Sequence, residues 1–187
     1  APEDLSIIKD SPAERRRFLD MELCQLDRIY AHNLISYNKV ITQRNKLLKD
    51  LDDHPDLRDT LDIWDEQLAS YGIPLIQSRK HFIGELDQLV KEIHLSLSGG
   101  REEAELSYAP NVEAEELRRV LARERVRDLK VRTSLTGPHR DDMIFTVNGV
   151  DVRHFGSQGQ QRTAALSLKL AEIEIVKRVI KDTPILL

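Results

Sequence analysis

The chain has 187 residues, of which 40% are hydrophobic, enough to bury a core and to build one domain or slightly more. Charged residues make up 32% of the chain and aromatic residues only 5%, a balance that favours long exposed helices and excludes a disordered chain or a typical β-sandwich. The formal net charge of −4 excludes an overall basic surface, so any contact with DNA has to come from a local patch.

The number of cysteines and the length of the apolar runs exclude further kinds of protein. The single cysteine, Cys24, excludes an internal disulfide framework and argues against a cysteine-based metal site, so no metal site is expected. No run approaches the roughly 18 apolar residues that a membrane span needs, and the first residues lack the pattern of a signal peptide. We therefore expect a cytoplasmic protein without membrane contact.

The first half of the chain has the pattern of long helices. Ser11 and Glu14 form a capping box around Pro12, and apolar residues then recur in steps of three and four for about forty residues, which predicts one helix that ends near Asp52. A second helix is expected from about Leu57 to Gly72 and a third from about Ile76 to Leu97. Short connections between the three predict an elongated antiparallel arm.

A small sheet region follows residue 100, where the apolar period changes to two. Strands are expected at 105–109, 131–135 and 143–147, with a charged helix at about 113–129 between the first two. Asn148-Gly149 before Val150 to Val152 is the strongest hairpin signal in the chain.

The last predicted helix runs from about Gln160 to Lys181 and carries two apolar faces, so we expect it to be buried on both. Pro184 to Leu187 has the pattern of a buried parallel strand at its start. The expected fold is mainly α with a small antiparallel sheet, that is, a helical arm plus part of an α/β head.

The segment from Phe155 to Thr163 is the strongest candidate for chemistry. Small residues let the backbone approach a ligand closely, Ser157 can cap the helix while offering its hydroxyl, and a helix N-terminus presents free N–H groups with positive partial charge. Arg162 in the first helical turn opposes the helix dipole, which makes better sense if an anion binds there. The alternative is an ordinary capped helix with a surface arginine.

Two further arginine groups are candidates for contact with DNA or nucleotide phosphate. Arg15, Arg16 and Arg17 lie in the first turns of a helix, but helical spacing spreads them around it, and at least one is expected to form an ion pair with Asp10, Glu14 or Asp20. The helix at 113–129 alternates arginine with acidic residues, which favours an exposed helix laced with salt bridges.

The turn that contains His139, Arg140, Asp141 and Asp142 is open to several interpretations. Neighbouring residues of an extended segment point to opposite faces, so the two aspartates would not readily share a metal ion. Gly137-Pro138 marks a turn, and the favoured role is support of the sheet, with a nucleic-acid or inter-subunit contact as the alternative.

Several long segments together resemble one protein family. The stretches 137–142 (GPHRDD) and 155–172 (FGSQGQQRTAALSLKLAE), with Asn148-Gly149 between them, closely resemble the RecF family. The stretches 2–5, 11–12 and 15–20 and the shorter motifs Gln43-Arg44-Asn45 and Trp64-Asp65 also fit the family, so the resemblance extends over essentially the whole chain.

The resemblance implies an ABC/SMC-like ATPase head with a helical lid, in which ATP joins two heads into a homodimer. One subunit would hold ATP in its P-loop, and the signature Ser157 to Gln160 of the other would contact the γ-phosphate. Ser157 and Gly159 would be the principal residues, with Gln158, Gln160 and Arg162 in support. Arg15, Arg16, Arg17, His139 and Arg140 are further candidates for phosphate or DNA contact.

The same resemblance implies a division into domains. Residues 1–10 would close an N-terminal ATPase lobe, 11–100 would form the lid, and 101–187 would form the signature-containing part of the head. No G-x-x-x-x-G-K-[ST] pattern occurs, and the Walker B acids of the family would follow Leu187. We therefore expect a fragment with the trans half of an ATP site, no catalytic residue and no ATP hydrolysis of its own. ATP and Mg²⁺ would belong to the intact protein.

The function implied is ATP-dependent DNA binding in recombinational repair. The intact protein would act at double-stranded and gapped DNA, with single-stranded DNA as a further option, cooperate with RecR to promote RecA loading, and be a weak DNA-dependent ATPase of the SOS response. One rival is a non-enzymatic SMC-like helical scaffold whose signature-like loop is only a helix cap. Another is an SMC-like nuclease subunit, which would need much longer helical arms.

Overall fold

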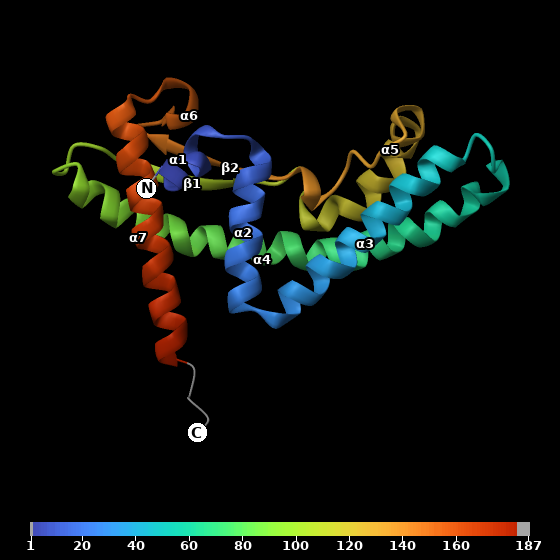
Figure 1. Ribbon diagram of the computed structural model, residues 1–187, viewed down its shortest axis with the longest axis horizontal. Coiled ribbons are helices and arrows are strands. Elements are labelled where there is room, and N and C mark those ends of the chain that lie inside the picture. Colours follow the sequence, from blue (N-terminus) through green and yellow to red (C-terminus); the bar gives the residue numbers. More distant parts are fainter. Residues whose placement is uncertain (1, 183–187) are drawn as a thin grey trace. The chain divides into compact units, whose positions relative to one another are not determined.

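The computed structural model describes residues 2–182, and their contacts divide into two compact units (Figure 1). The first unit comprises residues up to 22, 80–109 and 142 onward, and the second comprises 23–79 and 110–141.

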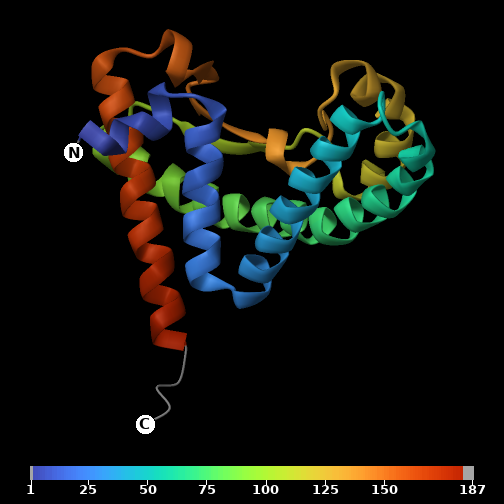
Figure 2. The same ribbon diagram turned by 45° about the vertical axis from the view of Figure 1, so that its right-hand side comes forward.

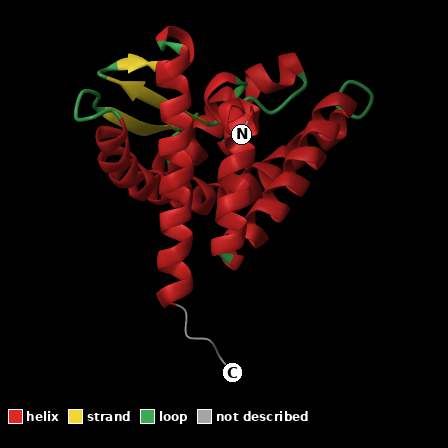
Figure 3. Ribbon diagram, turned by 60° about the vertical axis from the view of Figure 1, so that its left-hand side comes forward, coloured by secondary structure: helices red, strands yellow, loops and turns green. Residues whose placement is uncertain are grey.

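The first unit contains a three-stranded antiparallel sheet in the order β1-β2-β3 (Figure 3). β1 (Ala104–Ala109) pairs along its whole length with β2 (Asp142–Val147), and β2 turns into the two-residue strand β3 (Val150–Asp151). Asn148 and Gly149 both have positive φ, as a tight two-residue hairpin turn requires. The predicted hairpin is confirmed, but Val152 begins α6 (Val152–Phe155) instead of continuing the strand.

Helices flank this sheet within the same unit. α1 (Pro2–Lys9) and α6 pack against α7 (Gln158–Asp182), the long helix that the sequence predicts at 160–181. Of the face predicted to be buried, Ala164, Leu168, Ala171 and Ile175 are buried, whereas its last member, Val179, is 37% exposed. The side chains of the second face are 37–67% exposed in the described part of the chain, so the prediction that this face is also buried is wrong. This face consists of Leu166, Leu170, Ile173 and Ile180.

An antiparallel pair of helices forms the frame of the second unit (Figure 2). α3 (Arg28–Asp50) lies beside the first part of α4 (Leu61–Leu97), after the short 3₁₀ helix Pro55–Thr60. Contacts run in opposite order along the two helices, because Arg44 meets Asp65 near one end and Tyr30 meets Arg79 near the other. The predicted antiparallel packing is therefore confirmed for this pair, but it is wrong for the second and third predicted helices, which are one continuous helix, α4.

Two predicted helix boundaries in the arm are wrong. The first helix does not run unbroken, because Asp27 has extended backbone angles and its carboxylate accepts a hydrogen bond from Ile29 N–H, which ends α2 (Pro12–Leu26) and caps α3. Gly72 does not end a helix either, since α4 continues through Gly72 and Pro74. A Cβ on Gly72 would lie 3.0 Å from Leu117, so this glycine allows close packing within the second unit.

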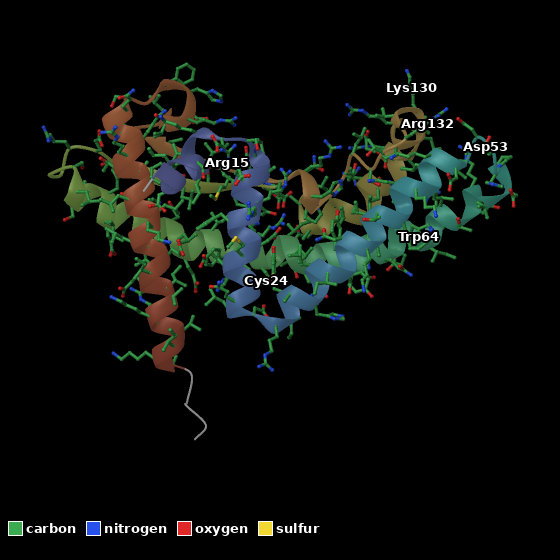
Figure 4. The ribbon with its side chains drawn as sticks, in the orientation of Figure 1. Arg15, Cys24, Asp53, Trp64, Lys130 and Arg132 are labelled. Atoms are coloured by element: carbon green, nitrogen blue, oxygen red, sulfur yellow. The ribbon has the colours of Figure 1, made fainter. Side chains whose placement is uncertain are left out.

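The charged helix is α5 (Leu117–Val131), and Arg119 and Arg127 pair with Glu116 and Glu124 as the interleaved pattern predicts, whereas two other arginines pair with acids of α4. Arg125 pairs with Asp62 and Asp65, and Arg118 pairs with Glu66. Lys130 and Arg132 project at its C-terminal end, where Arg132 has left-handed backbone angles and pairs with Asp52 (Figure 4). Residues 131–135 form the end of the helix and a loop, so the strand predicted there is wrong.

The fold class is confirmed as mainly α with a small antiparallel sheet. The domain boundaries at residues 10 and 100 stay predictions for the intact protein, and the contact units follow different limits. The strand expected at 184–187 lies outside the described residues. Over residues 2–182, no helix has both the length and the apolar character needed to cross a membrane.

Candidate phosphate-binding site

The turn before α7 is a reciprocal capping box. Ser157 Oγ accepts a hydrogen bond from Gln160 N–H at 3.1 Å, and Gln160 Oε1 accepts one from Ser157 N–H at 3.0 Å. The main-chain N–H of Gln161 donates to Ser157 C=O at 2.9 Å and closes the first turn. The capping role predicted for Ser157 is thus present, and the turn has a defined shape before any ligand binds.

This arrangement leaves a small set of donors facing outward. The first N–H groups of any helix have no acceptor inside it, and in this turn the capping box uses those of Ser157 and Gln160. Among the described contacts, the N–H groups of Gln158 and Gly159 are left over, together with the Ser157 hydroxyl hydrogen. Ser157, Gln158 and Gly159 are all exposed. Donors at a helix N-terminus, where the dipole is positive, suit an anion such as phosphate.

The two glycines of the turn serve different purposes. A Cβ on Gly156 would lie 2.6 Å from Val152 C=O, so internal packing requires glycine at this position. A Cβ on Gly159 would meet only Ser157 Oγ, at 3.8 Å, which is an ordinary contact. Nothing within the described chain demands glycine at 159, although glycine lowers helix stability. A glycine at this position would leave room for a ligand that approaches the backbone closely.

Of the side chains around the turn, two form hydrogen bonds within the first unit and one is exposed. Gln160 donates through Nε2 to Glu102 at 3.2 Å, so its carboxamide is engaged inside the unit and does not face outward with Ser157. Gln161 donates to Val152 C=O at 3.1 Å and ties α6 to α7. Arg162 is exposed in the first turn of α7, where a bound anion would meet it.

Arg15 is used inside the first unit. Its side chain is buried and pairs with Asp142, with Nε 2.5 Å from Oδ1, and it also donates to Asp10 C=O at 2.7 Å (Figure 4). At Arg15 the ion pair is with Asp142, which is not one of the three nearby acids expected as partners of this arginine group. Arg17 is exposed and Arg16 half-buried, so these two are more accessible for phosphate or DNA contact.

His139 is held inside the second unit by both ring nitrogens. Nε2 lies 2.7 Å from Ser134 C=O, which only accepts, so Nε2 carries the proton and Nδ1 accepts from Tyr37 Oη at 2.7 Å. Burial raises the pKa of the Tyr37 hydroxyl above its ordinary value, which keeps it a donor. Arg140, the next residue, is exposed and remains the accessible member of the motif for an anion.

Comparison with known proteins identifies the relatives. No model of a protein family matches the chain. The DNA replication and repair protein RecF of Agathobacter rectalis is 56% identical over 187 residues, and that of Lachnospira eligens is 55% identical over 189 residues. Both matches cover 100% of this chain. The chain belongs to the RecF family.

The match to RecF extends to solved structures. Structures of the recombination mediator protein RecF-ATPrS and RecF-ATP in the RecFOR pathway each superpose with a TM-score of 0.91 and 36% sequence identity over 98% of this chain. The chain spans about half the length, 52%, of the RecF relatives and structures that it matches.

Two residues next to the turn were missed by sequence reasoning. Glu102 bonds to Gln160, and the fully buried His94 contacts Glu102 with Nε2 3.0 Å from Oε1. Neither belongs to a motif, and Glu102 is 58 residues from Gln160 along the chain. No local pattern signals such a contact, because it depends on how the end of α4 and the loop after it pack beside α7.

Proposed function

We propose that the intact protein containing this chain is an ATP-dependent DNA-binding protein of recombinational repair. In this proposal the turn at Ser157 of one copy contacts the γ-phosphate of ATP held by a second copy, and ATP with Mg²⁺ therefore drives formation of a homodimer. ATP hydrolysis is weak, stimulated by DNA, and resets the dimer. The relatives support this proposal, since solved structures of RecF are described as RecF-ATP and RecF-ATPrS.

The wider role follows from the same relatives and remains part of the proposal. The intact protein acts in the cytoplasm at gapped and double-stranded DNA, cooperates with RecR, and promotes loading of RecA. Exposed cations supply the local contact that a chain of net charge −4 needs, and Arg17, Arg140 and Arg162 are the accessible candidates.

The observation that carries the proposed trans contact is the open side of Gly159. Its Cβ position is free of internal contacts closer than 3.8 Å, the described contacts include no acceptor for the N–H groups of Gln158 and Gly159, and both residues are exposed beside Ser157. A helix cap that served only the fold would tolerate alanine at 159 and gain stability from it.

A matched pair of glycines tests the proposal in the intact protein. Gly84 also lies within a helix, is exposed, and has nothing within 4 Å of its Cβ position. Gly84→Ala and Gly159→Ala should therefore both leave folding intact. We expect sedimentation to show ATP-driven dimers for the wild type and for Gly84→Ala, and a loss of at least about ten-fold in dimer affinity for Gly159→Ala. Ser157→Arg should abolish the dimer because its side chain occupies the phosphate position.

The opposite result separates this proposal from the scaffold alternative. If Gly159→Ala and Ser157→Arg dimerise with ATP as the wild type does, the turn is a structural cap. Binding of ATP to each variant is measured in parallel, because the proposal places the ATP held by a subunit outside this turn and expects that affinity to be unchanged. The isolated chain should show no ATP turnover, and Ser157-dependent turnover by it would overturn the assignment of a trans half-site.

A further inference from the structure

A continuous chain of polar contacts leads from the interior of the first unit to the Ser157 turn. His94 Nε2 lies 3.0 Å from Glu102 Oε1, Glu102 Oε2 accepts from Gln160 Nε2 at 3.2 Å, and Gln160 Oε1 accepts from Ser157 N–H at 3.0 Å. Each group in the chain therefore touches the next through a different atom.

Both ends of this series of polar contacts are connected to α7. At the inner end, His94 is fully buried and its Nδ1 lies 3.0 Å from Ser167 Oγ, which in turn donates to Thr163 C=O at 2.8 Å. At the outer end, Ser157 is exposed. The buried imidazole is thus fixed in place, and Glu102 transmits that position to the exposed turn.

The chemistry of Glu102 decides which way the Gln160 carboxamide points. A carboxamide has one accepting and one donating end of nearly the same shape, whereas an ionised carboxylate only accepts. Glu102 therefore attracts the amino end of Gln160 and turns its oxygen toward Ser157 N–H. Partial burial raises the pKa of Glu102, but hydrogen bonds from His94 and Gln160 outweigh it and hold the pKa below its ordinary value, so the carboxylate stays ionised.

We propose that Glu102 and His94 are positioning residues of the Ser157 turn, which hold Gln160 so that the Ser157 hydroxyl and the N–H groups of Gln158 and Gly159 keep the arrangement that receives a phosphate. This inference rests on the proposed function of the turn. Glu102 does not touch the phosphate itself, and a carboxylate in direct contact would repel it. Gln160 separates the two negative groups while passing on the orientation.

A charge swap between positions 102 and 160 tests the direction of this contact in the intact protein. Glu102→Gln places two carboxamides together: when the oxygen at position 102 accepts from His94, its amino group faces the amino group of Gln160, which opposes the orientation that Ser157 N–H needs. Gln160→Glu places two carboxylates together, which repel. The double variant Glu102→Gln with Gln160→Glu restores one donor and one acceptor. Its carboxamide at position 102 can accept from His94 and donate to the carboxylate at position 160, which can still accept from Ser157 N–H.

We expect each single variant to weaken ATP-driven dimerisation by roughly ten-fold and the double variant to recover most of that loss. The affinity for ATP within a subunit should be unchanged in all three, and hydrolysis should lose kcat while KM for ATP stays constant. A purely structural contact would instead lower the thermal midpoint in parallel with dimerisation. His94→Gln, which keeps a donor at about the distance of Nε2 from the main chain, should give a smaller loss than His94→Ala.

Failure of this inference can be told apart from failure of the proposed function. If wild-type protein dimerises with ATP and Gly159→Ala prevents it, while the single variants at 102 and 160 behave as the wild type, the positioning role is wrong and the signature role stands. If the wild type shows no ATP-driven dimer, or Gly159→Ala has no effect on it, the proposed function itself is wrong. Two defective single variants without recovery in the double variant would also overturn the inference.

Discussion

The segments 137–142 and 155–162 look alike as sequence, because each combines glycine, arginine and small polar residues, but the structure uses them in different ways. In the first, Asp141 is fully buried, pairs with Arg79 at 2.9 Å and accepts from Asn111 N–H at 2.8 Å. In the second, Ser157 and Gly159 are exposed, and the internal hydrogen bonds are those of a helix cap and its supports.

This difference separates a polar motif that stabilises the fold from one that is available to bind a ligand. Where buried donors and acceptors satisfy one another, the motif is explained by the fold, since an unpaired polar group there would be costly. Where exposed backbone donors lack partners among the described contacts and packing does not require a glycine, binding of a ligand or partner is the better explanation for the motif.

The largest effect should come from Asp141→Ala, which leaves the buried Arg79 guanidinium without its carboxylate. We expect a loss of about 3 to 5 kcal/mol in the free energy of unfolding, because removing one partner of a buried pair leaves a charge uncompensated. The matched control is Arg140→Ala, an exposed residue of the same motif, which should change stability by less than about 0.5 kcal/mol. Urea denaturation of both variants measures this, and similar losses would remove the architectural interpretation.

Gly137→Ala should have the next largest effect. Gly137 has φ of 136°, which side chains rarely adopt, and a Cβ there would come within 2.2 Å of Tyr37 Oη, the hydroxyl that holds His139. We expect a loss of about 2 to 4 kcal/mol from backbone strain and overpacking together. Circular dichroism melting would measure the loss. A variant as stable as the wild type would show that this turn accommodates a side chain, and that internal packing does not require glycine at position 137.

Sequence patterns predicted the parts of the fold that depend on neighbouring residues. Asn148-Gly149 predicted the hairpin because a tight turn needs positive φ at both positions, and Ser157 predicted the cap because its partner lies three residues away. Gly72 was misjudged, since a glycine that lets Leu117 approach has the same local pattern as one that ends a helix. Asp27 was overlooked because the apolar spacing continues across it.

The candidate site divides in the same way. The exposed Ser157, Gln158 and Gly159 could be named from their motif, whereas the partners that hold the motif in place could not. Arg15 finds Asp142 across 127 positions, and Gln160 finds Glu102 across 58. Such pairings are decided by the packing of elements that no local pattern connects.

Changing the pH distinguishes buried charge from exposed charge without mutation. Burial, followed by a hydrogen bond and repulsion from Glu172, raises the pKa of Glu22 from 4.5 to about 7. The folded state therefore binds a proton more tightly than the unfolded state, and the stability from that proton is present below pH 4.5 and is lost as the pH rises to 7. Ser157, Gln158 and Gly159 themselves carry no group that titrates in this range.

We expect the free energy of unfolding to fall by about 1 to 3 kcal/mol between roughly pH 5 and pH 8 through this pair. Glu22→Gln, which keeps the shape and removes the charge, should flatten that decline and be the more stable form at the higher pH. Urea denaturation at the two pH values provides the measurement. An equal decline in wild type and variant would place the pH dependence elsewhere.

The smallest effects should occur in the Ser157 turn, and there they should differ in sign. Ser157→Ala removes the cap that accepts from Gln160 N–H and should cost about 1 kcal/mol, whereas Gly159→Ala should add up to about 1 kcal/mol because alanine favours the helix and meets no internal clash. Thermal melting of the two variants measures the signs. A substitution that stabilises the chain while weakening ATP-driven dimerisation cannot act through folding, so it has to act on what the turn contacts. If Gly159→Ala instead destabilises the chain, its glycine has an internal purpose, and the contrast between the two motifs no longer holds.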